Sequence, residues 1–63
     1  MENSIKQISK NKGIKLNVLA KQTGLSQTTV YSIARGSSVP TLITAYKISK
    51  ALNTTIEDLF FKD

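Results

Sequence analysis

The chain has 63 residues, which is enough for one domain with a thin core and too little to enclose a deep substrate pocket. It contains no cysteine and no histidine, which excludes disulfides, the usual zinc sites and the commonest general base. Nine basic residues against four acidic ones give a net charge of +5, which excludes the class of strongly acidic, disordered chains.

Apolar residues recur at helical spacing through most of the chain, so we expect an all-α fold. A first helix is predicted over about residues 3–11, with Asn3 or Ser4 as its N-cap and Gly13 at its end. A second short helix is predicted over about 16–22 and is ended by Gly24. No run alternates with period two for long enough to predict a strand.

Three further helices are predicted, each preceded by a hydroxyl residue that can cap it. Ser26 is expected to cap a helix over about 27–34 by accepting a hydrogen bond from the amide of residue 28 or 29. Thr41 is expected to cap a helix over about 42–52, after a loop that contains Pro40. Thr55 opens a last short helix, and Asp58 stands three residues on, as in a variant of the capping box.

The apolar residues of these helices are expected to form one core. The leucines, isoleucines and Phe60 are assigned to it, including Leu42 at the start of the periodic stripe of the fourth helix. Tyr46 lies between core positions and is expected to be partly buried. Phe61 cannot share a helical face with Phe60, so one of the two rings is expected to be exposed, where it can serve as a dimer contact.

The segment from Leu16 to Gly36 has the order helix, short glycine turn, helix. Ala20 is small enough for the second of these helices to cross close over the first, and Leu25 can fill the angle between them. This arrangement holds a short helix out from the surface. Its exposed side carries hydrogen-bonding residues and no acid: Gln27, Thr28, Tyr31, Ser32 and Arg35.

The charges are unevenly distributed along the chain. The four acids, Glu2, Glu57, Asp58 and Asp63, all lie near its ends. Between Asn3 and Ile56 there is no acid, but there are eight basic residues: Lys6, Lys10, Lys12, Lys15, Lys21, Arg35, Lys47 and Lys50. A surface of one sign repels itself, and a polyanionic partner, either nucleic acid or an acidic membrane surface, relieves that repulsion. The alternative is a basic protein that is merely soluble.

A resemblance to a known family adds to these observations. The residues that carry it are Gly13-Ile14, Leu19-Ala20, Gly24-Leu25-Ser26, Thr29-Val30, Ile33, Gly36, Pro40-Thr41, Ile48, Ala51-Leu52 and Ile56-Glu57-Asp58-Leu59-Phe60. At this spacing the stretch from Ile5 to Phe60 resembles the phage Cro and repressor family of helix-turn-helix domains, also called the xenobiotic-response-element (XRE) type. The resemblance implies a compact, lambda-repressor-like bundle of five helices, with the motif at about 16–35 and its third helix in the major groove of DNA.

The resemblance also implies which residues contact DNA. The positions that match base-reading places are Gln27, Thr28 and Ser32, with Tyr31 as a neighbour that contacts a base or a phosphate. The positions expected to contact phosphate are Lys15, Asn17, Ser26, Arg35, Ser37 and Ser38. Lysines of the first and fourth helices either contact phosphate or are simply solvated.

The chain departs from the family pattern at three places. Leu16 stands where many members have a glutamine that binds a phosphate; Leu16 cannot make that bond, but Lys15 or Asn17 can substitute for it. The third helix ends in Ala34-Arg35-Gly36 where Glu-Asn-Gly is common, which removes an acid and adds a base. Thr23 stands where a leucine is common, so the core has less apolar packing at this position.

The sequence therefore predicts a cytoplasmic, sequence-specific DNA-binding regulator, a repressor that acts as a homodimer on duplex DNA. No catalytic arrangement, metal site, cofactor or small-molecule ligand is expected, and no apolar run is long enough for a membrane span or a signal peptide. A protein-interaction module of the same fold, such as an antitoxin or an anchor domain, is the alternative; its contact would be Phe61 and the short acidic tail. An enzyme is the third class and the least expected.

Overall fold

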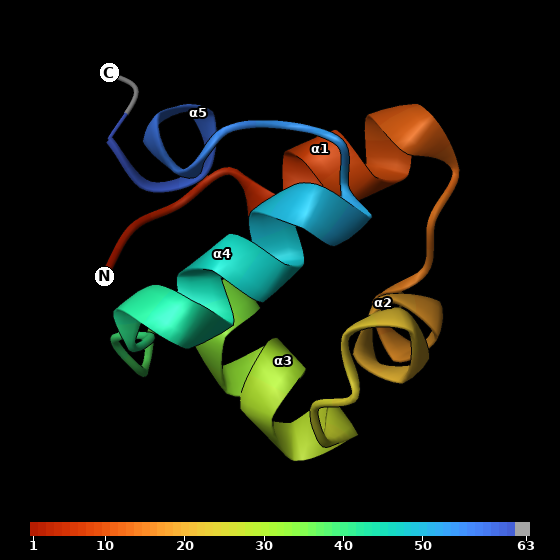
Figure 1. Ribbon diagram of the computed structural model, residues 1–63, viewed down its shortest axis with the longest axis horizontal. Coiled ribbons are helices and arrows are strands. Elements are labelled where there is room, and N and C mark those ends of the chain that lie inside the picture. Colours follow the sequence, from red (N-terminus) through yellow and green to blue (C-terminus); the bar gives the residue numbers. More distant parts are fainter. Residues whose placement is uncertain (62–63) are drawn as a thin grey trace.

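Residues 1–61, the part of the chain that the computed structural model describes, form five helices and no strand (Figure 1). The helices are α1 (Ile5–Lys12), α2 (Leu16–Thr23), α3 (Gln27–Ala34), α4 (Leu42–Ala51) and α5 (Ile56–Phe60). The predicted all-α fold is confirmed, and the limits of the first four helices lie within two residues of those predicted. Asp63 and the tail contact assigned to it lie outside the described residues.

Hydroxyl groups cap the last three helices as predicted. The capping bonds run from the N–H of Thr29 to Ser26 Oγ (3.1 Å), of Thr44 to Thr41 Oγ1 (3.2 Å) and of Asp58 to Thr55 Oγ1 (3.0 Å). At α1 the cap position is Ser4, but its side chain makes no capping bond. Instead, the N–H of Ile5 donates to Asn3 Oδ1 at 3.0 Å. Side chains thus satisfy one orphan donor at the start of four of the helices.

Left-handed residues end the helices at the chain reversals. Gly24 follows α2 with φ of +75°, and its backbone N–H points to the carbonyls of both Ala20 and Lys21. Asn53 follows α4 with φ of +53°, a conformation that asparagine tolerates better than most residues with a side chain. The chain can therefore turn sharply after each helix and pack the next one back on the core.

The core is built from one face of each helix. α2 packs against α3 and α4, and α5 packs against α4 (Figure 1). The backbone N–H of Ser4 donates to the carbonyl of Leu59 at 2.8 Å, which joins the start of α1 to α5. The buried apolar residues are Ile5, Leu19, Ala20, Val30, Ile33, Ala34, Ala45, Ile48, Leu52, Leu59 and Phe60.

Two core assignments, Leu42 and Ile43, and the expected partial burial of Tyr46 are wrong. Leu42 is largely exposed, because the first turn of α4 lies at the edge of the bundle, whereas α2 and α5 cover the later positions Ala45, Ile48 and Leu52. Tyr46 is also exposed, and its ring lies 6.0 Å from the Lys50 ammonium instead of in the core. Ile43, which was assigned to the core with the other isoleucines, is exposed at the same edge as Leu42. The prediction that one of the two adjacent rings is exposed is confirmed, since Phe60 is buried and Phe61 is not.

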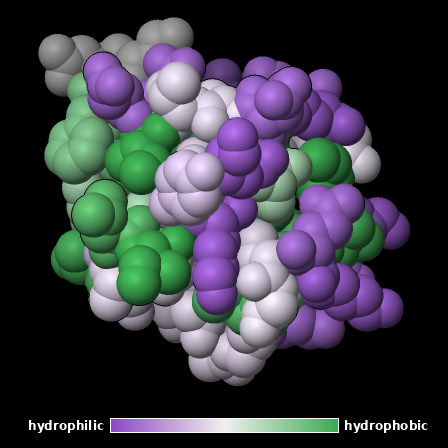
Figure 2. Space-filling view, viewed as in Figure 1, coloured by the Kyte–Doolittle hydropathy of each residue, from purple (hydrophilic) through white to green (hydrophobic). Residues whose placement is uncertain are grey.

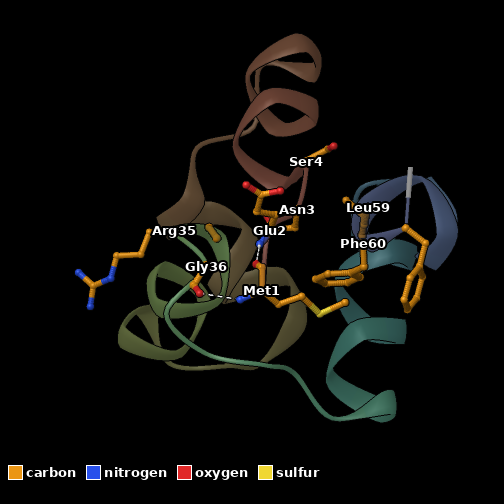
Figure 3. Close-up of a pocket in the computed structure, with 10 residues that line it drawn as sticks. Met1, Glu2, Asn3, Ser4, Arg35, Gly36, Leu59 and Phe60 are labelled. Carbon is orange, nitrogen blue, oxygen red and sulfur yellow. Dashed lines mark hydrogen bonds between the residues drawn. The ribbon is translucent and has the colours of Figure 1, made fainter. Parts of the chain in front are cut away.

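The N-terminal segment crosses the end of α3 and is bonded to it. Asn3 Nδ2 donates to the carbonyl of Ile33 at 2.7 Å and to that of Met1 at 3.1 Å, and the Met1 amino group donates to the carbonyl of Gly36 at 2.6 Å. Figure 3 shows Met1 lying between Gly36 and the Phe60 ring. Because Asn3 Oδ1 also accepts from Ile5, this one amide joins α1 to α3.

Replacing Asn3 by alanine is expected to destabilise the domain by about 1–2 kcal/mol, because the Ile5 N–H loses its cap and the Ile33 carbonyl keeps only its bond from the Gly36 N–H. In a domain of this size, each kcal/mol of lost stability lowers Tm by about 4–8 °C. Thermal unfolding followed by circular dichroism measures this fall in Tm. The control is Asn11→Ala, an exposed position on α1 that is expected to change stability by less than about 0.5 kcal/mol. Equal Tm values for the two variants would contradict the role of Asn3.

Candidate nucleic-acid interface

α2 and α3 are joined by a tight turn that the backbone itself holds. The N–H of Leu25 donates to the carbonyl of Ala20 at 3.2 Å, and the Leu25 side chain packs against the core, as predicted. The half-buried Thr23 hydroxyl donates back to the carbonyls of Leu19 (2.9 Å) and Ala20 (3.0 Å). Thr23 thus replaces apolar packing with hydrogen bonds that close the end of α2.

α3 is buried along one side and exposed along the other. Val30, Ile33 and Ala34 fix it to the core. The opposite side presents Gln27, Thr28 and Tyr31, all exposed, and the half-buried Ser32. These are the four residues predicted to contact bases, and the structure brings them together on one polar face of a helix at the edge of the domain (Figure 1). Amide and hydroxyl groups in this position can pair with base edges.

A hollow lined by basic residues lies between α1, the start of α2 and α3. Lys6, Lys10, Lys15, Asn17 and Tyr31 line it. Hydrophilic side chains dominate this side of the molecule, over α2 and the end of α1 (right in Figure 2). Lysines from two segments therefore meet beside the polar face of α3.

The start of α2 gives the hollow hydrogen-bond donors that suit an anion. The start of α2 has Lys15 at its cap position, and within residues 1–61 the Lys15 side chain makes no capping hydrogen bond. Asn17 Oδ1 accepts from the N–H of Val18 at 2.9 Å. The buried Ser9 Oγ, from a residue that also lines the hollow, has no hydrogen-bond partner in the described part of the chain. The first-turn N–H groups of α2 that Asn17 leaves unbonded favour a phosphate.

The other end of α3 carries a second group of predicted phosphate contacts. Arg35 Nε donates to Ser37 Oγ at 2.8 Å, and Ser37 Oγ donates to the carbonyl of Ser32 at 3.2 Å. The backbone N–H groups of Ser37 and Ser38 both point to the same carbonyl of Ser32. In Figure 3 the Arg35 side chain extends away from the pocket at the N-terminal segment and toward solvent. The loop is thereby held in one shape with its guanidinium outward.

The predicted contact residues thus fall into three groups: a polar helix face, a basic hollow on one side and an ordered arginine-serine loop on the other. Ser26 stands at the start of the helix face, with its hydroxyl donating to Thr29 Oγ1 at 2.8 Å besides accepting the capping bond. The sequence left Lys6 and Lys10 among the lysines of the first helix that either contact phosphate or are simply solvated. Because they are four residues apart, the two lysines share one face of α1, and in the structure this face lies beside the start of α2. The spacing of four was therefore the sequence signal that could have grouped them.

Other kinds of site receive little support from the described residues. Among residues 1–61, no group of three or more His, Cys, Asp and Glu residues is placed to hold a metal ion. None of the helices in this part of the chain combines the length and the apolar character that crossing a membrane requires. Glu57 and Asp58 lie in the first turn of α5, where capping and the helix dipole account for them.

Comparisons with known proteins agree with this geometry. The helix-turn-helix family model HTH_3 matches residues 5–59. The chain is 34% identical over 61 residues to an uncharacterized HTH-type transcriptional regulator, YgzD, of Bacillus subtilis, covering 97% of this chain and 92% of that protein. It is 35% identical over 63 residues to an uncharacterized HTH-type transcriptional regulator of Archaeoglobus fulgidus, covering 100% of this chain and 90% of that one.

A solved structure is also similar. The crystal structure of an HTH_3 family transcriptional regulator from Vibrio cholerae superposes with a TM-score of 0.78 at 33% sequence identity. The match covers 87% of this chain but only 31% of that protein, so the present chain corresponds to about one third of that regulator. The likeness therefore concerns one domain of the longer protein.

Proposed function

This chain belongs to the HTH_3 family of helix-turn-helix proteins, and from that premise we propose that it binds a specific sequence in duplex DNA and represses transcription there. The observation that carries the proposal is the polar face of α3, which is free of acids and flanked by basic groups on both sides. The activity belongs in the cytoplasm, where a regulator of this kind meets its DNA.

In the proposed complex, α3 lies in the major groove with its N-terminal half against the bases. Gln27 pairs with the edge of an adenine through its amide, and Thr28 and Ser32 contact bases through their hydroxyls. Tyr31 is exposed on the same face but also lines the basic hollow, so its hydroxyl suits the sugar-phosphate backbone at the rim of the groove. Sequence preference then rests mainly on Gln27, Thr28 and Ser32.

The flanking groups hold the backbone of the duplex. The start of α2, with Lys15 and Asn17, receives one phosphate, and Lys6 and Lys10 add positive charge beside it. Ser26 contacts the backbone at the start of α3, and Arg35, Ser37 and Ser38 do so at the other end. These contacts fix the register of the protein on DNA but carry no sequence information.

A pair of such domains is needed for a site of useful length. We propose that the protein acts as a homodimer, with its two α3 helices about 34–36 Å apart, one turn of DNA, on two inverted half-sites. Neither a cofactor nor a small-molecule ligand forms part of the proposal. In its simplest form, the concentration of the protein alone sets how fully the site is occupied.

The proposal is tested by titrating the protein into a fluorescent duplex from its own upstream region and into a scrambled duplex. We expect tighter binding to the upstream duplex by about 10³-fold or more, the usual margin for a specific regulator. Equal affinity for the two duplexes would show that the protein binds DNA without sequence specificity. Absence of binding to either duplex at low salt would refute DNA binding and favour the alternative of a protein-interaction module.

The basic hollow makes a separate prediction about salt. Replacing Lys6, Lys10 and Lys15 together by glutamine is expected to flatten the slope of log affinity against log salt by about 0.9 for each phosphate that the variant no longer binds, up to about 2.7. The control is Lys12→Gln, which removes the same charge from α1 but on the side that faces Asp58 and Thr54. We expect the control slope to match the wild type. A triple variant with an unchanged slope would show that the hollow binds no phosphate.

A further inference from the structure

A groove runs between α3 and the loop that leads from it to α4. From α3, Thr28 and Ser32 line the groove, and both are residues proposed above to read bases. From the loop, Val39 and Pro40 line it. Val39 is apolar and 74% exposed. The polar face of α3 is thus continued, across the groove, by an apolar side chain that none of the contacts proposed above uses.

The backbone fixes Val39 from both sides. Before it, the N–H of Ser38 donates to the carbonyl of Ser32 at 3.3 Å, which joins the loop to α3. After it, Pro40 restricts the preceding residue to extended conformations, and Thr41 then caps α4. Branching at Cβ also limits the rotamers of the valine itself. A contact made by Val39 therefore costs little conformational entropy.

The apolar character of Val39 indicates what it contacts on DNA. Val39 belongs neither to the core nor to the half-buried residues that pack against it, so packing of the domain does not account for it. The base edges in the major groove present hydrogen-bond donors, acceptors and one apolar group, the 5-methyl group of thymine. A valine can satisfy no donor or acceptor. In a groove that continues the base-reading face, the thymine methyl is therefore its matching partner.

We propose that Val39 contacts the 5-methyl group of a thymine in the half-site that α3 of the same chain reads, and thereby selects that base. The inference rests on the proposed DNA-binding function, because Val39 meets the bases only when α3 lies in the major groove. It adds a specificity-determining residue outside the helix. The loop after α3 then has two roles, since its serines hold the phosphate backbone and its valine reads a base.

The size of this contact can be estimated from the apolar surface that it buries. Burying one methyl-sized group changes an affinity about 4-fold, so two half-sites together give about 16-fold. Truncating Val39 to alanine should lose a similar factor on the thymine duplex. On a duplex that lacks the methyl group, the same truncation should lose almost nothing, because the partner of the valine is already absent.

The first experiment finds the site without assuming its sequence. Duplexes that bind the wild type are selected from a pool of random sequence, and the selection is repeated with Val39→Ala. We expect the same site from both proteins, with one thymine in each half-site that the wild type requires and at which the variant accepts other bases. Because Val39 is exposed, circular dichroism should show an unchanged fold. Identical base preferences at every position would overturn the proposal.

The second experiment removes the methyl group alone. Deoxyuridine pairs with adenine as thymidine does and keeps the O4 acceptor, but it lacks the 5-methyl group. Placing it at that thymine in both half-sites should weaken wild-type binding about 16-fold and Val39→Ala binding less than about 2-fold. Val39→Ile keeps a branched apolar side chain and should respond as the wild type does. The matched control, Val18→Ala, truncates an exposed valine on α2 and should also respond as the wild type does.

The outcomes separate this inference from the function on which it rests. If the wild type selects a site but uracil weakens the wild type and Val39→Ala equally at every thymine, the methyl contact is refuted and sequence-specific binding stands. If uracil weakens neither protein at any thymine, Val39 lies against the sugar-phosphate backbone and the inference is equally refuted. A wild type that selects no sequence from the pool would refute specific binding and, with it, the methyl contact.

Discussion

The variant with both Gln27 and Thr28 replaced by alanine is expected to lose about 30- to 1000-fold in affinity for its specific site. A bidentate pair to a base is worth about 1–3 kcal/mol of discrimination, and the threonine contact adds to it. Both side chains are exposed on α3, so their truncation leaves the core unchanged. Fluorescence titration of the specific and scrambled duplexes measures the loss. Because phosphate contacts remain, binding to the scrambled duplex should change little.

The control for this experiment is Gln22→Ala, which truncates the same amide on α2, in a position that lines a groove with Tyr46 and Lys47. It should bind the specific duplex as the wild type does. Retention of full specific affinity by the double variant would refute the base-reading roles of Gln27 and Thr28. An equal loss on both duplexes would instead assign them to the backbone of the DNA.

The second large effect is expected from Leu19→Ala. Leu19 is fully buried on α2, which packs against both α3 and α4. Truncating a buried leucine costs about 2–5 kcal/mol, the higher values applying where the cavity cannot collapse. Domains are stable by about 0.05–0.15 kcal/mol per residue, which for a chain this short is on the order of 3–9 kcal/mol in all. A large fraction of the molecules should therefore be unfolded at 37 °C, and DNA binding should fall in proportion.

Urea unfolding followed by circular dichroism measures this change in the free energy of unfolding. Val18→Ala is the control, since it shortens the neighbouring side chain on the same helix at an exposed position. It is expected to change stability by less than about 0.5 kcal/mol. A loss of under about 1 kcal/mol for Leu19→Ala would show that α2 is less tightly packed than the structure indicates.

Helix positions and ends could be predicted well because local chemistry determines them. Ser26, Thr41 and Thr55 each cap a helix through their own hydroxyl, and a glycine in the left-handed region follows α2. Each signal lies within four residues of the feature it specifies. The family resemblance added that the five helices form one compact bundle with the motif at about 16–35, which the periodicity alone did not give.

The errors arose where burial depends on distant segments. Leu42 continues the apolar period of α4, but whether its turn is covered depends on where α2 and α5 end in space. The expected partial burial of Tyr46 is wrong for the same reason. Lys6 and Lys10 were left between phosphate contact and simple solvation, because their place beside α2 depends on the angle at which the chain leaves α1. The roles in DNA binding of the ten predicted contact residues stay predictions, although the structure places them in three coherent groups.

The Asn3 amide has a consequence for the order in which the molecule assembles. Contacts between α2 and α3 join neighbours in the sequence, so this pair can dock early and quickly. The bond from Asn3 to the carbonyl of Ile33 spans 30 residues and closes a large loop. The entropy of closing this loop delays the bond relative to the contacts between α2 and α3. The last turn of α3 should therefore become protected from hydrogen exchange together with residues 1–4, and fraying of that segment should expose both at once.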